Sequence, residues 1–174
     1  MTFIQRGRRG VAEIADITPE TIILQGNVRI EQIEGDWLRL DDQEVRDTLE
    51  RPTIIYAERV EIDQRTNDAR FFQEVLIIQP NRAAEGDVAT YLDGSQTLAL
   101  TSDSAPALLC DRGDDNTTDL STVENLPGQE ALNITCRGAD RISSSRITLD
   151  MANDTFTTEG QSQLQFRLPP DDTL

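Results

Sequence analysis

The sequence ILQGNVRI, at Ile23–Ile30, follows AEIADI, at Ala12–Ile17, and this two-part motif is the most informative feature of the chain. Variants of it return at Ala57–Ile78 and Ala139–Phe166, and a fainter one begins at Ala89. Each copy reads as a strand of acidic and apolar residues, a turn, and a second alternating strand. Repeats of this length are typical of one supersecondary unit stacked on copies of itself. The repetition therefore predicts a stack of β-strands.

Alternation of apolar and polar residues recurs along the chain and predicts about ten to twelve short strands. Turn-forming residues separate them at Gln64–Asp68, Asp93–Ser95 and Ala152–Asp154. We expect the alternation to resume as a strand through Leu132–Gly138, and there is almost no helix signal. The predicted fold class is all-β, with stacked strands in a sandwich, a barrel or a solenoid.

The length of 174 residues suits one domain, which we place at 11–168. Residues 1–10 are expected to form a flexible basic N-terminus, and 169–174 a tail that begins with two prolines. Asp111–Glu130 carries six carboxylates and one Arg with almost no apolar residues. This composition predicts an acidic loop insertion at 111–130.

The charge of the chain excludes several classes of partner. The 16 cationic residues are all Arg, and 32 carboxylates bring the net charge to −16. Such a chain is repelled by nucleic acid and by an anionic membrane surface. No apolar run approaches the length of about 18 residues that spans a bilayer. The start, MTFIQRGRRG, is not a signal peptide, so either a targeting segment has been removed or the chain is cytoplasmic.

Catalytic and metal-binding patterns are weak. Without His, the usual Ser-His-Asp and Cys-His arrangements are absent, and with so many acids no carboxylate pair stands out. We therefore expect no enzyme activity, cofactor or metal. The acids between Asp111 and Asp119 could gather around calcium, but they lack the Gly and terminal Glu of an EF-hand, which favours a solvated loop.

The two cysteines, Cys110 and Cys136, are a candidate disulfide. Such a bridge would close a loop of about 27 residues and contribute about 3–4 kcal/mol. The alternative is two buried thiols that act as small apolar side chains.

Apolar side chains at equivalent positions of the repeats form a continuous stripe, which is either the domain core or, in an open stack, a trough that accepts acyl chains. We predict that the trough is lined by Ile22, Leu24, Val28, Ile30, Leu38, Leu40, Val60, Ile62, Phe71, Val75, Ile77, Leu98, Leu100, Ile142, Phe156 and Leu164. If the interior is only core, the chain is a structural β-solenoid or adhesin-like module with an acidic surface that binds calcium or a partner.

The repeated motifs also resemble a known family. Ala57-Glu58-Arg59-Val60-Glu61-Ile62-Asp63 is similar to the first strand of the OstA-like lipopolysaccharide-transport proteins, the type of LptA, LptC and the periplasmic domain of LptD. Gly26-Asn27-Val28 resembles the end of their second strand, with Gln73-Glu74-Val75 and Gly160-Gln161-Ser162 as degenerate copies. The absence of Lys, the acidity and the two cysteines indicate a divergent branch, such as a cyanobacterial one.

This resemblance implies an open, twisted β-jelly roll in the periplasm, whose apolar interior shields the acyl chains of lipid A. It implies partners too: lipopolysaccharide itself, and other OstA-like components that dock through edge strands to bridge the inner and outer membranes. Backbone hydrogen bonding at an exposed edge gives such docking a physical basis. Arg29, Arg39 and Arg59 could pair with phosphates at the rim.

Overall fold

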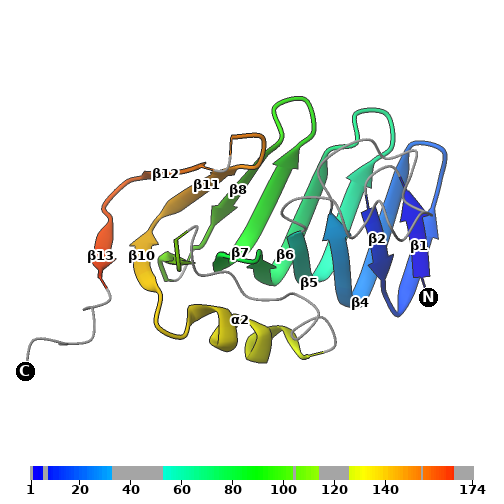
Figure 1. The fold of residues 1–174 in the computed structure, drawn as a ribbon. Helices are drawn as coiled ribbons and strands as arrows, with labels where there is room; N and C mark the ends of the chain where they lie inside the picture. Colours follow the sequence, from blue (N-terminus) through cyan, green and yellow to red (C-terminus); the bar gives the residue numbers. More distant parts are fainter. Residues whose placement is uncertain are drawn as a thin grey trace, which may run out of the picture.

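The computed structural model describes residues 2–5, 8–32, 53–103, 105–113, 126–153 and 155–166. Its strands within these ranges are joined in one antiparallel 13-stranded sheet, with one helix against it (Figure 1). The elements are β1 (Thr2–Gln5), β2 (Arg8–Val11), β3 (Ile14–Ile17), β4 (Thr21–Gln32), β5 (Thr53–Asp63), β6 (Ala69–Ile78), β7 (Arg82–Leu92), β8 (Thr97–Thr101), β9 (Ala107–Asp111), α2 (Gly128–Cys136), β10 (Asp140–Ser144), β11 (Arg146–Asp150), β12 (Thr155–Glu159) and β13 (Gln163–Gln165).

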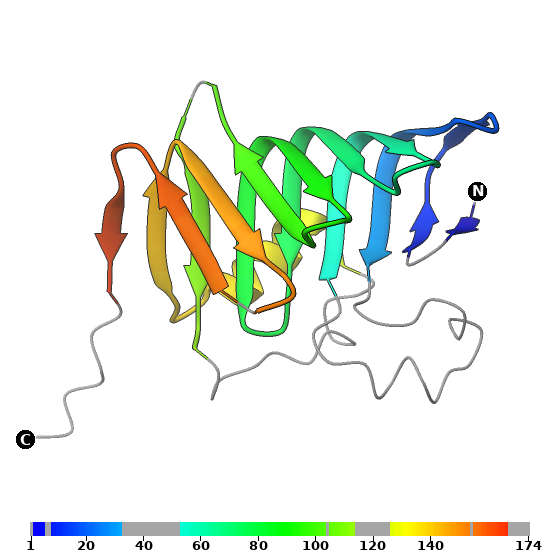
Figure 2. The ribbon, with the colours of Figure 1, turned by 90° about the horizontal axis from the view of Figure 1, so that it is seen from above.

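The long strands β4 and β7 change partners halfway along their length. The first half of β4 pairs with β3 and the second half with β2, whereas the first half of β7 pairs with β9 and the second half with β8. The sheet therefore divides into two layers that share β4–β7. We call them the β8 layer, with β3, β8, β11 and β12, and the β9 layer, with β1, β2, β9, β10 and β13. Figure 2 shows the strands of both layers following one another along the molecule.

Bulges mark the crease at which the shared strands pass from one layer to the other. In β4 the bulge is Gly26–Asn27, with φ of 82° and 44°, and the register with β5 shifts there. In β6 it is Gln73–Glu74, with φ of 65° and 50°. A bulge bends its strand and increases the local twist. These are two of the aligned motif copies, and in the third Gly160 has a φ of 88°. The repeated motif therefore corresponds to a repeated bend.

The main hydrophobic core lies between the two layers. On β5 the core-facing residues have odd numbers before the crease, up to Ala57. After the crease, from Val60 onward, they have even numbers. The same change occurs on β7 between Ala84 and Ala89. The bent strands thus keep one apolar face toward the interior in both layers. The all-β, open jelly-roll class predicted from the sequence is confirmed.

A second, smaller core lies on the outer side of the β9 layer, beneath α2. Ala131, Leu132 and Cys136 of the helix pack there with buried side chains of β5, β6 and β7. A disulfide joins Cys136 to Cys110 of β9, with the two Cα atoms 5.2 Å apart. The bridge fixes the helix to the sheet.

The prediction of a strand through Leu132–Gly138 is wrong, because Gly128–Cys136 is helical. The buried residues are Ala131, Leu132, Thr135 and Cys136, a spacing that follows the helical period, whereas a strand would bury only alternate positions. Pro127 stands at the N-cap position, immediately before the helix.

The three predicted hairpins are confirmed, between β5 and β6, β7 and β8, and β11 and β12. Residues 2–5 and 8–11, where we expect a flexible terminus, instead form β1 and β2, since the open edge of β4 offers hydrogen-bonding partners to β2. The predicted loop 111–130 is too wide, as Asp111 ends β9 and Gly128 begins α2. The core of that loop, 114–125, and the predicted tail at 169–174 lie outside the described residues.

Candidate functional site

The structure brings most of the predicted trough residues together in the interior. Twelve of the sixteen belong to one buried cluster between the layers: Ile22, Leu24, Val28, Ile30, Val60, Ile62, Phe71, Val75, Ile77, Leu98, Leu100 and Ile142. Phe156 is half-buried and packs against this cluster, whereas Leu164 is 59% exposed. Leu38 and Leu40 lie outside the described residues, as does Arg39.

The middle of this interior is filled by its own side chains. Phe71, Leu98 and Leu100 are each 0% exposed. A cavity large enough for an acyl chain would forfeit these contacts, because protein interiors are close-packed. A hydrocarbon chain can therefore enter only where the two layers end or where they separate.

Both ends of the sheet are open among the described strands. At one end β1 and β3 each pair on a single side, and at the other end β12 and β13 do so. Figure 1 places these pairs at opposite ends of the molecule, near the N-terminus and near the C-terminus. Unpaired edges offer rows of backbone N–H and C=O groups.

Inward-facing apolar side chains are exposed at these open ends. Ile17 of β3 stands opposite Ile22 in register and shares its inner face, yet it is 59% exposed. Leu164 of β13 likewise stands opposite Ile142 and is 59% exposed. Phe166, just after β13, is 69% exposed. The apolar interior thus reaches solvent at each end.

Two of the three predicted rim arginines, Arg29 and Arg59, do not face this interior. Arg59 donates from Nε and Nη2 to Oε1 of Glu61, at 3.1 and 2.9 Å. Arg29 stands in register with Tyr56, which packs against the outer core beneath α2. Both guanidinium groups therefore belong to the outer side of the sheet, since Val28 and Val60 next to them point inward.

The sequence analysis missed Arg82, which lies at the start of β7 and is 8% exposed. It shares the inner face with Ala84 and stands opposite Asp111 of β9. Its guanidinium lies 5.5 Å from the centre of the Phe156 ring. The alternation of Arg82 with Ala84 indicates that its side chain points inward, although charged side chains ordinarily face solvent.

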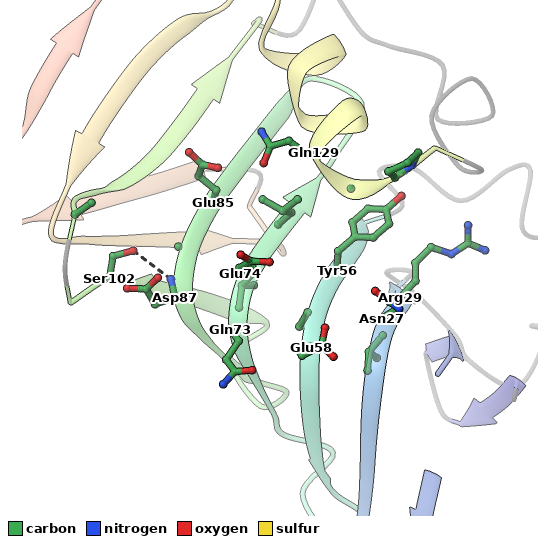
Figure 3. A pocket seen from close by; sticks show the side chains of 18 of the residues that line it. Asn27, Arg29, Tyr56, Glu58, Gln73, Glu74, Glu85, Asp87, Ser102 and Gln129 are labelled. Carbon is green, nitrogen blue, oxygen red and sulfur yellow. Dashed lines mark hydrogen bonds between the residues drawn. The ribbon is translucent and has the colours of Figure 1, made fainter. Parts of the chain in front are cut away.

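A groove of about 830 Å³ lies on the outer side of the crease, under the first turn of α2 (Figure 3). Tyr56 and Gln129 line one part of it, and carboxylates line the other: Glu58, Glu74, Glu85 and Asp87. Asp87 is fixed there because its backbone N–H donates to Ser102 Oγ at 3.1 Å. So many carboxylates disfavour an anionic ligand in this groove.

Two hairpin turns carry carboxyl groups with lowered pKa values. Hydrogen bonds from the backbone N–H of Arg65 lower the pKa of Asp63 below its ordinary value of 3.8. The side-chain amide of Asn153 does the same for the pKa of Asp150. Both groups stabilise turns at the rim of the β8 layer.

The fold defines an all-β class: an open-ended jelly roll of two antiparallel layers around an apolar interior. A solved structure with this architecture is LptH of Pseudomonas aeruginosa, described as the LptA-homologous periplasmic component of the lipopolysaccharide transport device. The TM-score is 0.58 with 11% identity over 95% of this chain and 96% of that one. No family model and no curated protein sequence matches the chain. Within the described residues, no helix has the length and apolarity needed to cross a membrane.

Proposed function

We propose that this chain is a periplasmic lipid carrier without enzyme activity. It holds the acyl chains of lipopolysaccharide between its two layers and contributes one unit to a bridge between the inner and outer membranes. The observation that carries the proposal is the exposure of inner-face apolar side chains, Ile17 and Leu164, at the open ends.

Two further observations support it. The fold is that of LptH, whose described role is lipopolysaccharide transport. The chain also holds a buried disulfide between Cys110 and Cys136, and such bridges persist in oxidising compartments such as the periplasm.

The bridge would form by strand addition. The edges β1 and β3 of one molecule would receive β13 and β12 of the next, so that each layer continues across the junction. The two continuous layers would then enclose both Ile17 of one molecule and Leu164 of the next. Acyl chains could pass along this interior without contacting water, which favours their transfer by about 0.8 kcal/mol per buried CH₂.

The test uses the first and last residues of β3. Ile17 and Ile14 are almost equally exposed, at 59% and 60%, but Ile14 stands opposite Gln25 on the outer face. A photoreactive residue at position 17 should crosslink to lipopolysaccharide in the envelope of the source organism, whereas the same residue at position 14 should not. Equal labelling from both positions, or none from position 17, would contradict the proposal.

A further inference from the structure

Beyond β7 the two layers meet on two sides of the molecule, one at the crease and one opposite the crease. The layers are joined differently on these two sides. On the crease side the chain itself connects them, through Ser145 between β10 and β11 and through the turn between β12 and β13. Ser144 and Ser145 both donate from Oγ to the carbonyl oxygen of Glu159, at 2.7 and 2.8 Å. This side therefore resembles a closed hinge.

The opposite side is formed by two rims. The rim of the β8 layer includes the turn between β11 and β12, just before Phe156. The rim of the β9 layer includes the turn between β6 and β7, just before Arg82, and the end of β9 at Asp111. Among the described strands, none crosses from one rim to the other, and we call the space between them the gap.

Arg82 reaches across it. Its Nε lies 3.6 Å from Oδ2 of Asp111 in its own layer, and its guanidinium lies 5.5 Å from the ring of Phe156 in the other layer. Phe156 stands opposite Leu149, whose side chain is 2% exposed in the interior. The ring therefore faces inward, and the guanidinium can lie against it.

The chemistry suits a contact that can open. Asp111 remains beside the guanidinium of Arg82 as its counter-ion whether or not the ring is present. The attraction to the ring joins the two layers, and one cation–π contact is weak compared with the strand pairing of the crease.

We propose that Arg82, held by Asp111, and Phe156 form a clasp that keeps the rims closed and must release for an acyl chain to enter the filled middle of the interior, beyond the open ends. The entry step rests on the proposed lipid-carrier function. The closure itself does not, because it concerns the free protein.

Closure can be measured by the distance between spin labels on the outer faces of the two layers. Gln165 of β13 and Thr157 of β12 are exposed, and both are next to inward-facing residues. Cysteines introduced at these positions can be labelled selectively, since the native pair is bridged. Phe156→Leu and Arg82→Met remove the cation–π contact from either side. Phe72→Leu, a half-buried Phe on β6 outside the interior cluster, is the matched control.

We expect one narrow distance for the wild type and for Phe72→Leu. Phe156→Leu and Arg82→Met should each raise the population at longer distances about fivefold, and the double variant should add little to either. The rate of lipopolysaccharide crosslinking from a photoreactive residue at position 71, in the buried interior cluster, should rise by a similar factor in the two clasp variants.

Distance distributions of the clasp variants that match Phe72→Leu would overturn the closure. Opened layers with an unchanged crosslinking rate would overturn the entry step. Absence of crosslinking in every variant, with the layers opened as expected, would instead refute the lipid-carrier function and leave the closure standing.

Discussion

The substitution Gly26→Ala tests whether the crease depends on its bulge. Gly26 has a φ of 82°, which costs a residue with a Cβ about 1–2 kcal/mol. An added Cβ would lie 2.5 Å from Oε2 and 2.8 Å from Cβ of Glu13, so Glu13 must move. Its carboxylate would then lose the hydrogen bond from Asn27, worth about 0.5–1.5 kcal/mol. The reduced entropy of the unfolded chain offsets about 0.4–1 kcal/mol.

The net expectation is a free energy of unfolding lower by about 0.5–3 kcal/mol, measured by urea denaturation monitored by circular dichroism. Gly94→Ala is the control, because an added Cβ there meets nothing within 4 Å and its φ is not left-handed. It should change stability by less than about 0.5 kcal/mol. Conversely, Gln73→Gly should raise stability by up to about 1 kcal/mol, since Gln73 has a φ of 65°. A Gly26→Ala protein as stable as the control would refute the role assigned to the bulge.

Two other predictions concern the disulfide and the turns. Cys136→Ser should lower the free energy of unfolding by about 2–4 kcal/mol, and reductant should then have no further effect; equal stability of the variant and the oxidised wild type would contradict this. Asp63 and Asp150 have lowered pKa values in the folded state, so their contribution is present above the ordinary value of 3.8 and is lost as the pH falls below it. The double variant Asp63→Asn, Asp150→Asn should lose less free energy of unfolding than the wild type between about pH 4 and pH 2, measured by urea titrations at each pH. An unchanged acid profile would show that the turns do not hold these carboxylates.

The sequence was most informative where one face of a strand is buried. Along β4 the core-facing residues Ile22, Leu24, Val28 and Ile30 all fall on even positions, because the bulge at Gly26 preserves the parity. Alternation therefore predicted this strand and its inner face correctly.

It was least informative where the chain departs from a simple period. On β5 the core-facing residues have odd numbers up to Ala57 and even numbers from Val60 onward. Because of this change, counting every second residue from Val60 misses Ile55 and Ala57, which also face the core. Leu132 and Cys136 fit both a strand and a helix, and only Ala131 and Thr135 distinguish the helical period.

The exposure of apolar side chains at the open ends could not be predicted from the sequence. Ile142 and Leu164 have the same kind of pattern, yet one is buried and the other is exposed, because β13 is the last strand of its layer. Arg82 was missed for a related reason. A charge is expected to face solvent, but here its counter-ion Asp111 comes from a strand more than 20 residues away in sequence, and only the fold brings the two together.

Two adjacent phenylalanines on β6 can show whether acyl chains occupy the space between the layers. Phe71 is 0% exposed in the interior cluster, whereas the half-buried Phe72 is on the other face of the strand. With a photoreactive residue at each position in turn, the account predicts that position 71 crosslinks to the acyl chains of lipopolysaccharide and position 72 does not. Crosslinks from position 72 alone, or from neither, would contradict it.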